Sequence, residues 1–188
     1  MANVKLNPVV DRLRGRIGDL VFKKVFGTAY VARKPETGDR EFTELQKANQ
    51  ERFRQATVYG KMAMADPQVR VLYEEAAKDK KQPVFSVMIA DFFHAPTVDE
   101  IDLSGFTGQQ GSTIGVRASD DFGVVGVNVT ITDQAGLAIE QGPATMSATE
   151  PGKWLYTTTT SIQPGTQVRV EATAKDRPGN TATKTENT

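Results

Sequence analysis

The sequence predicts an α+β chain in two parts, an N-terminal β-hairpin with a three-helix unit followed by a C-terminal all-β sandwich. Two observations predict this fold class. Apolar residues recur at helical spacing between residues 42 and 93, and beyond Pro96 the period of the pattern changes to two. At 188 residues the chain is long enough for two small domains. We therefore divide it into a basic arm and hairpin (1–35), a helical unit (36–95) and a sandwich (96–188).

The first segment predicts a β-hairpin. Two runs rich in β-branched and aromatic residues, 20–25 and 29–33, flank the turn Phe26-Gly27-Thr28. An isolated two-stranded hairpin is only marginally stable in water. The hairpin must therefore lie on the helices, join another sheet, or pair with a neighbouring molecule through its edge.

Three helices are expected in the second segment. The apolar spacing predicts a first helix over about 43–65. Asp66 as N-cap and a proline at the first helical position then predict a second helix over 67–78. Pro83 can open a third helix, which must end before Pro96 because the residue preceding a proline is disfavoured in the helical region.

The third segment predicts a β-sandwich, because short runs of β-forming residues alternate with turn signals. Seven strands are expected, at 98–103, 112–118, 124–132, 137–140, 154–159, 167–174 and 181–184. In the strand over 124–132, Val125, Val127, Val129 and Ile131 alternate with smaller or polar residues, so this face is expected to enter the core.

Part of the sandwich resembles a known family. The residues concerned are Ala118-Ser119-Asp120-Asp121-Phe122-Gly123-Val124, the alternating strand after them, Trp154, and the late turn Ala174-Lys175-Asp176-Arg177-Pro178-Gly179-Asn180. They look like the corresponding phrases of a bacterial immunoglobulin-like domain, over roughly half of the chain. Such domains serve as spacers, adhesion modules and virion decorations, so the resemblance implies a fold rather than one function. Without a cysteine pair, apolar packing centred on Trp154 would hold the sheets together.

A shorter stretch, 71–81, is similar to the closing part of the third helix of a high-mobility-group box, a minor-groove DNA-binding fold. That family bends DNA with an apolar wedge and basic residues early in the box, and this sequence has no counterpart to them. Ordinary helix composition is the alternative explanation.

The net charge of zero hides a polarity along the chain. Residues 1–61 hold 13 basic and 7 acidic residues, whereas residues 95–188 hold 6 basic and 11 acidic ones. A basic front and an acidic back can steer association with an outside polyanion or with a second copy, head to tail. Unevenly charged surfaces are also common without any such role.

Seven basic residues form the candidate interaction site: Arg12, Arg14, Arg16, Lys23, Lys24, Arg33 and Lys34. In an extended chain the three arginines point to one face, because they occupy every second position. These residues could contact phosphates, with Phe22, Phe26 and Tyr30 as stacking partners for bases. The alternative is a solvated hairpin face whose aromatic side chains belong to the core.

Catalytic and cofactor chemistry find little support, and no enzyme, cofactor or transition-metal site is predicted. The chain has no cysteine and one histidine, and no glycine-rich phosphate loop. His94 follows Asp91 at helical spacing, which alone is a weak metal signal. Calcium stays open as an alternative, in case four sandwich aspartates gather at one end: Asp120, Asp121, Asp133 and Asp176. Aspartate also favours turns for local reasons.

No membrane span is expected, since the longest apolar run, 84–93, is interrupted by Ser86 and Asp91. The N-terminal residues show no secretory signal, which favours the cytoplasm or an assembled particle and leaves the compartment open.

We therefore expect a non-enzymatic structural or interaction protein that assembles with itself or with another protein. Edge-strand pairing through residues 20–33, together with contact between a basic front and an acidic sandwich, is the expected mechanism. Nucleic-acid binding by the basic N-terminal region is the alternative, and surface adhesion through the sandwich loops is a third possibility.

Overall fold

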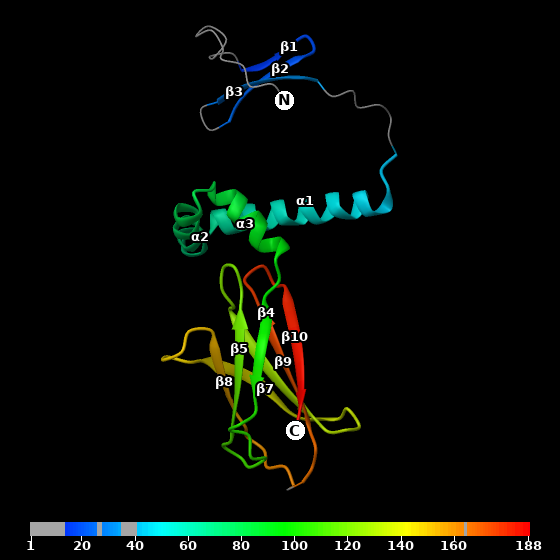
Figure 1. Ribbon diagram of the computed structural model, residues 1–188, viewed down its shortest axis with the longest axis vertical. Coiled ribbons are helices and arrows are strands. Elements are labelled where there is room, and N and C mark those ends of the chain that lie inside the picture. Colours follow the sequence, from blue (N-terminus) through cyan, green and yellow to red (C-terminus); the bar gives the residue numbers. More distant parts are fainter. Residues whose placement is uncertain (1–13, 26–27, 35–40, 164) are drawn as a thin grey trace. The chain divides into compact units, whose positions relative to one another are not determined.

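The computed structural model describes residues 14–25, 28–34, 41–163 and 165–188, and within them the fold is α+β (Figure 1). The chain divides into two units, residues 1–47 and 48–188. The helices are α1 (Glu44–Ala65), α2 (Pro67–Lys80) and α3 (Val84–Phe93). The strands are β1 (Gly15–Ile17), β2 (Leu20–Val25), β3 (Thr28–Arg33), β4 (Thr97–Asp102), β5 (Thr113–Ser119), β6 (Gly126–Thr132), β7 (Ala138–Met146), β8 (Lys153–Thr157), β9 (Arg169–Lys175) and β10 (Thr181–Asn187).

The N-terminal unit contains a three-stranded antiparallel sheet with the order β1-β2-β3. The predicted hairpin is present as β2 and β3, which pair from Leu20 opposite Arg33 to Val25 opposite Thr28. The sequence analysis missed β1, which pairs with β2 through only three residues and leaves β2 in the centre. The predicted turn residues Phe26 and Gly27 lie outside the described residues.

The three helices begin and end close to their predicted limits. The Asp66 side chain accepts hydrogen bonds from the backbone N–H groups of Gln68 (2.9 Å) and Val69 (3.4 Å), so it caps α2 as expected. The helix then continues to Lys80, two residues beyond the predicted end. It stops where Lys81 adopts a left-handed conformation with φ of 51°.

Small residues let α1 and α3 approach each other closely. Ala56, Gly60 and Ala63 of α1 are buried. A Cβ atom on Gly60 would lie 2.8 Å from the Phe85 ring of α3, so this position leaves no room for a side chain unless the ring moves. The helical core is small and consists of Ala63, Tyr73, Ala77, Val87 and Met88.

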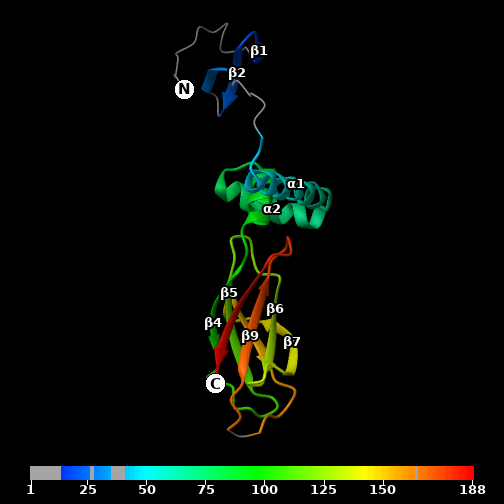
Figure 2. The same ribbon diagram turned by 90° about the vertical axis from the view of Figure 1, so that its right-hand side faces the viewer.

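Residues 97–187 form a β-sandwich-like domain whose strands are all antiparallel to their neighbours. The order is β10-β9-β6-β7-β8-β5-β4, with β7 joining the two layers (Figure 2). Its core draws on both layers: Val98, Ile101, Ile114, Val116, Ala118, Val127, Val129, Ile131, Ala144, Trp154, Tyr156, Val168, Val170, Ala172 and Ala174. Trp154 is 8% exposed, which confirms its expected place in this core.

The sandwich strands depart from the prediction at two points. Val125 is 47% exposed, because β6 begins only at Gly126, so the predicted inward face starts at Val127 instead. Strand β7 continues to Met146, well past the predicted end at residue 140. It passes through Gly142 and Pro143, two residues that argue against a strand in sequence.

The two outer strands of this sheet, β4 and β10, lie beside each other and nearly close it into a barrel (Figures 1 and 2). A bulge interrupts β4 between Val98 and Glu100. Across the seam, the Lys184 ammonium of β10 donates a hydrogen bond to the carbonyl oxygen of Asp99. A lysine and a bulge are two devices that protect sheet edges from pairing with other chains.

Over the described residues, no helix is both long enough and apolar enough to cross a bilayer.

Candidate interaction site

The register of the N-terminal sheet distributes its side chains over two faces. Residues that pair across strands share a face, and neighbours along a strand alternate. One face, which we call the apolar face, carries Gly15, Ile17, Leu20, Phe22, Lys24, Ala29, Val31 and Arg33. The opposite face, which we call the mixed face, carries Arg16, Val21, Lys23, Tyr30 and Ala32.

The predicted basic residues are thereby divided. Arg16 and Lys23 lie on the mixed face, whereas Lys24 and Arg33 lie at the apolar face. Arg14 and Lys34 flank the strands, and Arg12 lies outside the described residues. The common face predicted for the three arginines assumed an extended chain. Gly15 has a φ of 105°, which breaks that alternation next to Arg16.

The sheet has no interior of its own. Every side chain described in β1, β2 and β3 is exposed or half-buried, and Ile17 and Leu20 are 60% and 44% exposed. An apolar face that stays in water gives the sheet none of the stabilisation that burial would supply. Within the residues that the structure describes, β3 pairs only with β2, so its outer edge is open.

A second constellation lies where the helices meet the sandwich, and we call it the helix–sandwich junction. It comprises Tyr59, Tyr73 and Asp91 from the helices, and Asp120, Phe122, Asp176, Arg177 and Asn180 from two sandwich loops. The Phe122 ring lies 5.7 Å from the Tyr73 ring and 4.1 Å from the Lys80 ammonium. Phe122 thus joins the helical core from the loop between β5 and β6.

Asp91 is a deeply buried carboxylate of the junction, with 1% of its surface exposed, the same fraction as for Asp176 and Tyr73. The Tyr73 hydroxyl donates a hydrogen bond to Asp91 Oδ2, and the Tyr59 and Tyr73 hydroxyls lie 2.6 Å apart. Burial raises the pKa of Asp91 to about 6, and the nearby charges of Asp120 and Asp176 act in the same direction. The Tyr73 hydrogen bond and Arg177 partly oppose this rise in pKa.

The late turn of the sandwich fixes the end of α3. The Asn180 amide donates to the carbonyl oxygens of Phe92 and His94, both at 3.2 Å. Asp176, which is buried, holds the turn by accepting from the backbone N–H of Gly179 and from the backbone and side chain of Asn180. The turn therefore satisfies carbonyl groups that a helix end leaves without partners.

The four aspartates considered for calcium do not gather at one end. Asp133 follows the end of β6 farthest from the junction, because Thr132 pairs with Arg169 while Gly126 pairs with Lys175. The other three have local roles: Asp120 accepts from two backbone N–H groups of its own loop, and Asp121 lies 2.7 Å from His94 Nδ1. In the described part of the chain, no group of three or more acidic, histidine or cysteine side chains is arranged to hold a metal ion.

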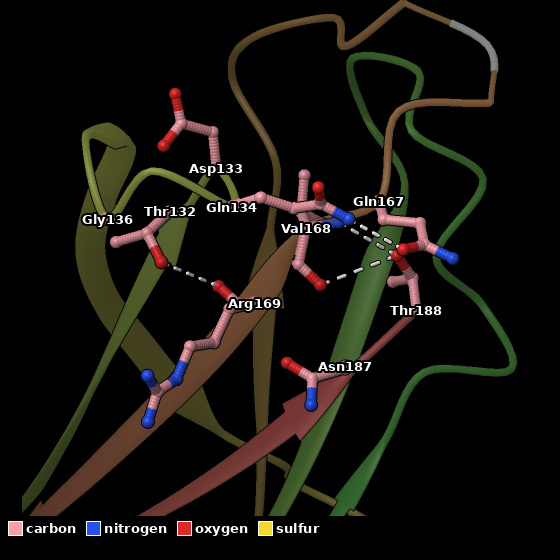
Figure 3. A pocket seen from close by; sticks show the side chains of 9 residues that line it. All are labelled: Thr132, Asp133, Gln134, Gly136, Gln167, Val168, Arg169, Asn187 and Thr188. Atoms are coloured by element: carbon pink, nitrogen blue, oxygen red, sulfur yellow. Dashed lines mark hydrogen bonds between the residues drawn. The ribbon is translucent and has the colours of Figure 1, made fainter.

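A shallow hollow of about 610 Å³ lies at the far end of the sandwich (Figure 3). Its walls are polar: Thr132, Asp133, Gln134, Gly136, Gln167, Val168, Arg169, Asn187 and Thr188. Most of these groups bind one another, as where the Gln134 amide donates to Gln167 Oε1 at 2.7 Å and Thr132 Oγ1 donates to the Arg169 carbonyl at 3.4 Å. The hollow thus resembles a solvated loop end more than a prepared ligand site.

Sequence reasoning missed the junction because its members come from five separate stretches of the chain. The one available signal was Asp91, a single carboxylate in α3, whose other residues apart from Ser86 are apolar. A charged residue on an apolar helix face is either solvated or paired in the interior.

No protein family model matches the chain, and no curated protein matches its sequence. Among solved structures, CopC from Methylosinus trichosporium OB3b is 16% identical with a TM-score of 0.36, covering 49% of this chain and 89% of its own. A tetra-tandem repeat from the extending region of a large adhesion protein is 27% identical with a TM-score of 0.33, covering 50% of this chain and 23% of its own. Both neighbours are β-sandwich-type folds.

Proposed function

We propose that this chain is a non-enzymatic structural or interaction protein that assembles through its N-terminal sheet, with an immunoglobulin-like sandwich as its second module. The observation that carries the proposal is the three-stranded sheet whose described side chains are all exposed or half-buried. A neighbour that covers or extends such a sheet removes its exposed apolar side chains from water, which stabilises the assembly. Among the described residues, β3 pairs only with β2, so its outer edge offers backbone groups for that purpose.

Charge supplies a second contact between copies. The sheet region 14–34 holds six basic residues and one acidic residue, whereas the sandwich carries an excess of acidic ones. Attraction between the basic sheet region of one copy and the acidic sandwich of another raises the rate of association and is screened by salt. This part of the association is therefore expected to weaken as salt is raised.

The test is sedimentation of the full chain and of a variant lacking residues 1–35. Both core clusters lie outside the deleted segment, so the variant should keep its helical and β circular dichroism. We expect the full chain to self-associate and the deletion variant to sediment as a monomer. An oligomer that survives the deletion unchanged would contradict the proposal.

Nucleic-acid binding stays the second candidate, favoured by one observation. Arg16, Lys23 and Tyr30 share the mixed face, and Lys23 lies directly opposite Tyr30. Two cations beside an aromatic ring suit a single strand, whose phosphates and bases they would contact. Co-sedimentation with DNA at low salt, lost in Arg16→Glu and Lys23→Glu while self-association persists, would favour this function over assembly.

A further inference from the structure

The hydrogen bonds of β3 reveal which of its backbone groups face outward. Lys34 N–H donates to the Asp19 carbonyl at 2.6 Å, so these two residues form a hydrogen-bonded antiparallel pair just beyond the strand. Hydrogen-bonded and non-hydrogen-bonded pairs alternate along such a ladder. With the observed register, Thr28, Tyr30 and Ala32 therefore bond to β2. The N–H and C=O groups of the remaining residues, Ala29, Val31 and Arg33, point away from β2 toward the open edge.

This edge lacks the devices that protect the sandwich. Strand β3 pairs with β2 over six residues without a register shift, and no proline or bulge interrupts it. In the sandwich, by contrast, a bulge in β4 and the Lys184 ammonium occupy the seam between the outer strands. A regular edge without such devices is a template for another strand.

We propose that the β3 edge binds the β3 edge of a second copy in antiparallel orientation, about a two-fold axis that passes through Val31. This inference rests on the proposed assembly function and specifies its partner and register. With the axis at Val31, each Ala29 faces Arg33 of the other copy, and the two Val31 residues face each other. All three outward residues of each strand then find partners, forming about six backbone hydrogen bonds.

Moving the two-fold axis to a neighbouring residue gives a less favourable strand pairing. An axis at Ala32 would place Ala29 opposite Pro35, which has no N–H to donate. An axis at Arg33 would set two guanidinium groups directly opposite each other, which is destabilising across strands. An axis at Tyr30 would set Arg33 opposite residue 27, which lies beyond the start of β3 at Thr28.

The Val31 axis also joins the apolar faces of the two sheets. Phe22 lies opposite Val31 within one copy, so the sequence across the dimer runs Phe22, Val31, Val31 and Phe22 on one continuous face. Two three-stranded sheets become one six-stranded sheet. Because both sheets are basic, they repel each other, and salt screens this repulsion. The contact between two β3 edges should therefore strengthen as salt is raised, whereas the contact between the basic sheet region and the acidic sandwich should weaken.

Disulfide trapping tests the register, and the chain has no cysteine of its own to interfere. In the proposed register, Tyr30 of one copy faces Ala32 of the other as a non-hydrogen-bonded pair with Cα atoms about 4.5 Å apart, within disulfide range. A mixture of Tyr30→Cys and Ala32→Cys chains, exchanged and then oxidised, should give a cross-linked heterodimer. Cross-linking of the Tyr30→Cys chain alone or of the Ala32→Cys chain alone would place the axis elsewhere and overturn the proposed register.

A backbone variant tests the contact without relying on cross-linking. Val31→Pro removes an outward N–H while leaving the bonds between β2 and β3 in place, and each dimer loses two edge hydrogen bonds. We expect the dissociation constant to rise about 10- to 30-fold, and the matched Val31→Ala, which keeps the N–H, to have a smaller effect. Equal dissociation constants for Val31→Pro and the unchanged protein would overturn β3 pairing, even if deletion of residues 1–35 still produced a monomer. A monomeric full chain would contradict both proposals.

Discussion

Replacing Asp91 by asparagine should flatten the dependence of stability on pH. The pKa of Asp91 is about 6 in the folded protein, against 3.8 for an ordinary aspartate. The folded state therefore holds the proton more tightly than the unfolded state, and between these values the free energy of unfolding falls as pH rises. Above pH 6 the folded protein bears the whole cost of an ionised, buried carboxylate.

The magnitude follows from the two pKa values. Each unit of difference corresponds to about 1.4 kcal/mol, so the full effect is about 3 kcal/mol, of which about 2 kcal/mol falls between pH 4.5 and 7.5. Asparagine retains an oxygen that can accept from the Tyr73 hydroxyl but has no charge to titrate. Unfolding by urea at both pH values, for the parent protein and for Asp91→Asn, gives the difference directly.

Comparing the two proteins cancels the titration of the groups that do not interact with Asp91. Asp99→Asn serves as a matched control, since Asp99 is exposed and uses its backbone carbonyl, not its carboxylate, to accept from Lys184. This control shows how the same exchange of a carboxylate for an amide acts at an exposed position. If Asp91→Asn ran parallel to the parent across the pH range, Asp91 would not be a buried carboxylate with a raised pKa, and the account of the junction would be wrong.

Four further substitutions test the packing around this centre and the sandwich core by urea unfolding at pH 5. Tyr73→Phe removes the hydroxyl that donates to Asp91, and we expect a loss of about 1–3 kcal/mol, because a buried acceptor loses its partner. Asn180→Ala removes the amide that caps α3 and should cost about 1–2 kcal/mol; no loss would show that the turn does not hold the helix end. Ile131→Ala should cost about 2–5 kcal/mol, whereas Val125→Ala should stay within about 0.5 kcal/mol, because Ile131 is fully buried and Val125 is not. Equal losses would contradict the start of β6 at Gly126.

Local patterns predicted most of the regular elements, since helices and strands follow from spacing along the chain. Asp66 and Pro67 predicted the start of α2 because capping is a local interaction. The extent of β7 was missed because Gly142 and Pro143 lower strand propensity, a preference that pairing with β6 overrides. The short β1 has too few residues to show any period.

The candidate site could likewise be predicted only in part from the sequence. The basic residues of the N-terminal segment are visible in the sequence, but their division between two faces depends on the register and on Gly15. The helix–sandwich junction depends on contacts between residues such as Asn180 and Phe92, which lie 88 positions apart. No pattern within one segment carries that information.

The outer strands of the sandwich and of the N-terminal sheet differ in how well they can pair with another chain, and this difference limits where assembly can occur. The sandwich nearly closes on itself, with Lys184 and the β4 bulge at the seam, so its outer strands do not present a regular ladder to another chain. The N-terminal sheet presents a regular six-residue edge whose outward groups are self-complementary about Val31. If strand pairing drives assembly of this protein, β3 is the better edge of the N-terminal sheet, because it offers six residues where the other outer strand, β1, offers three. The sandwich then contributes charge rather than an edge.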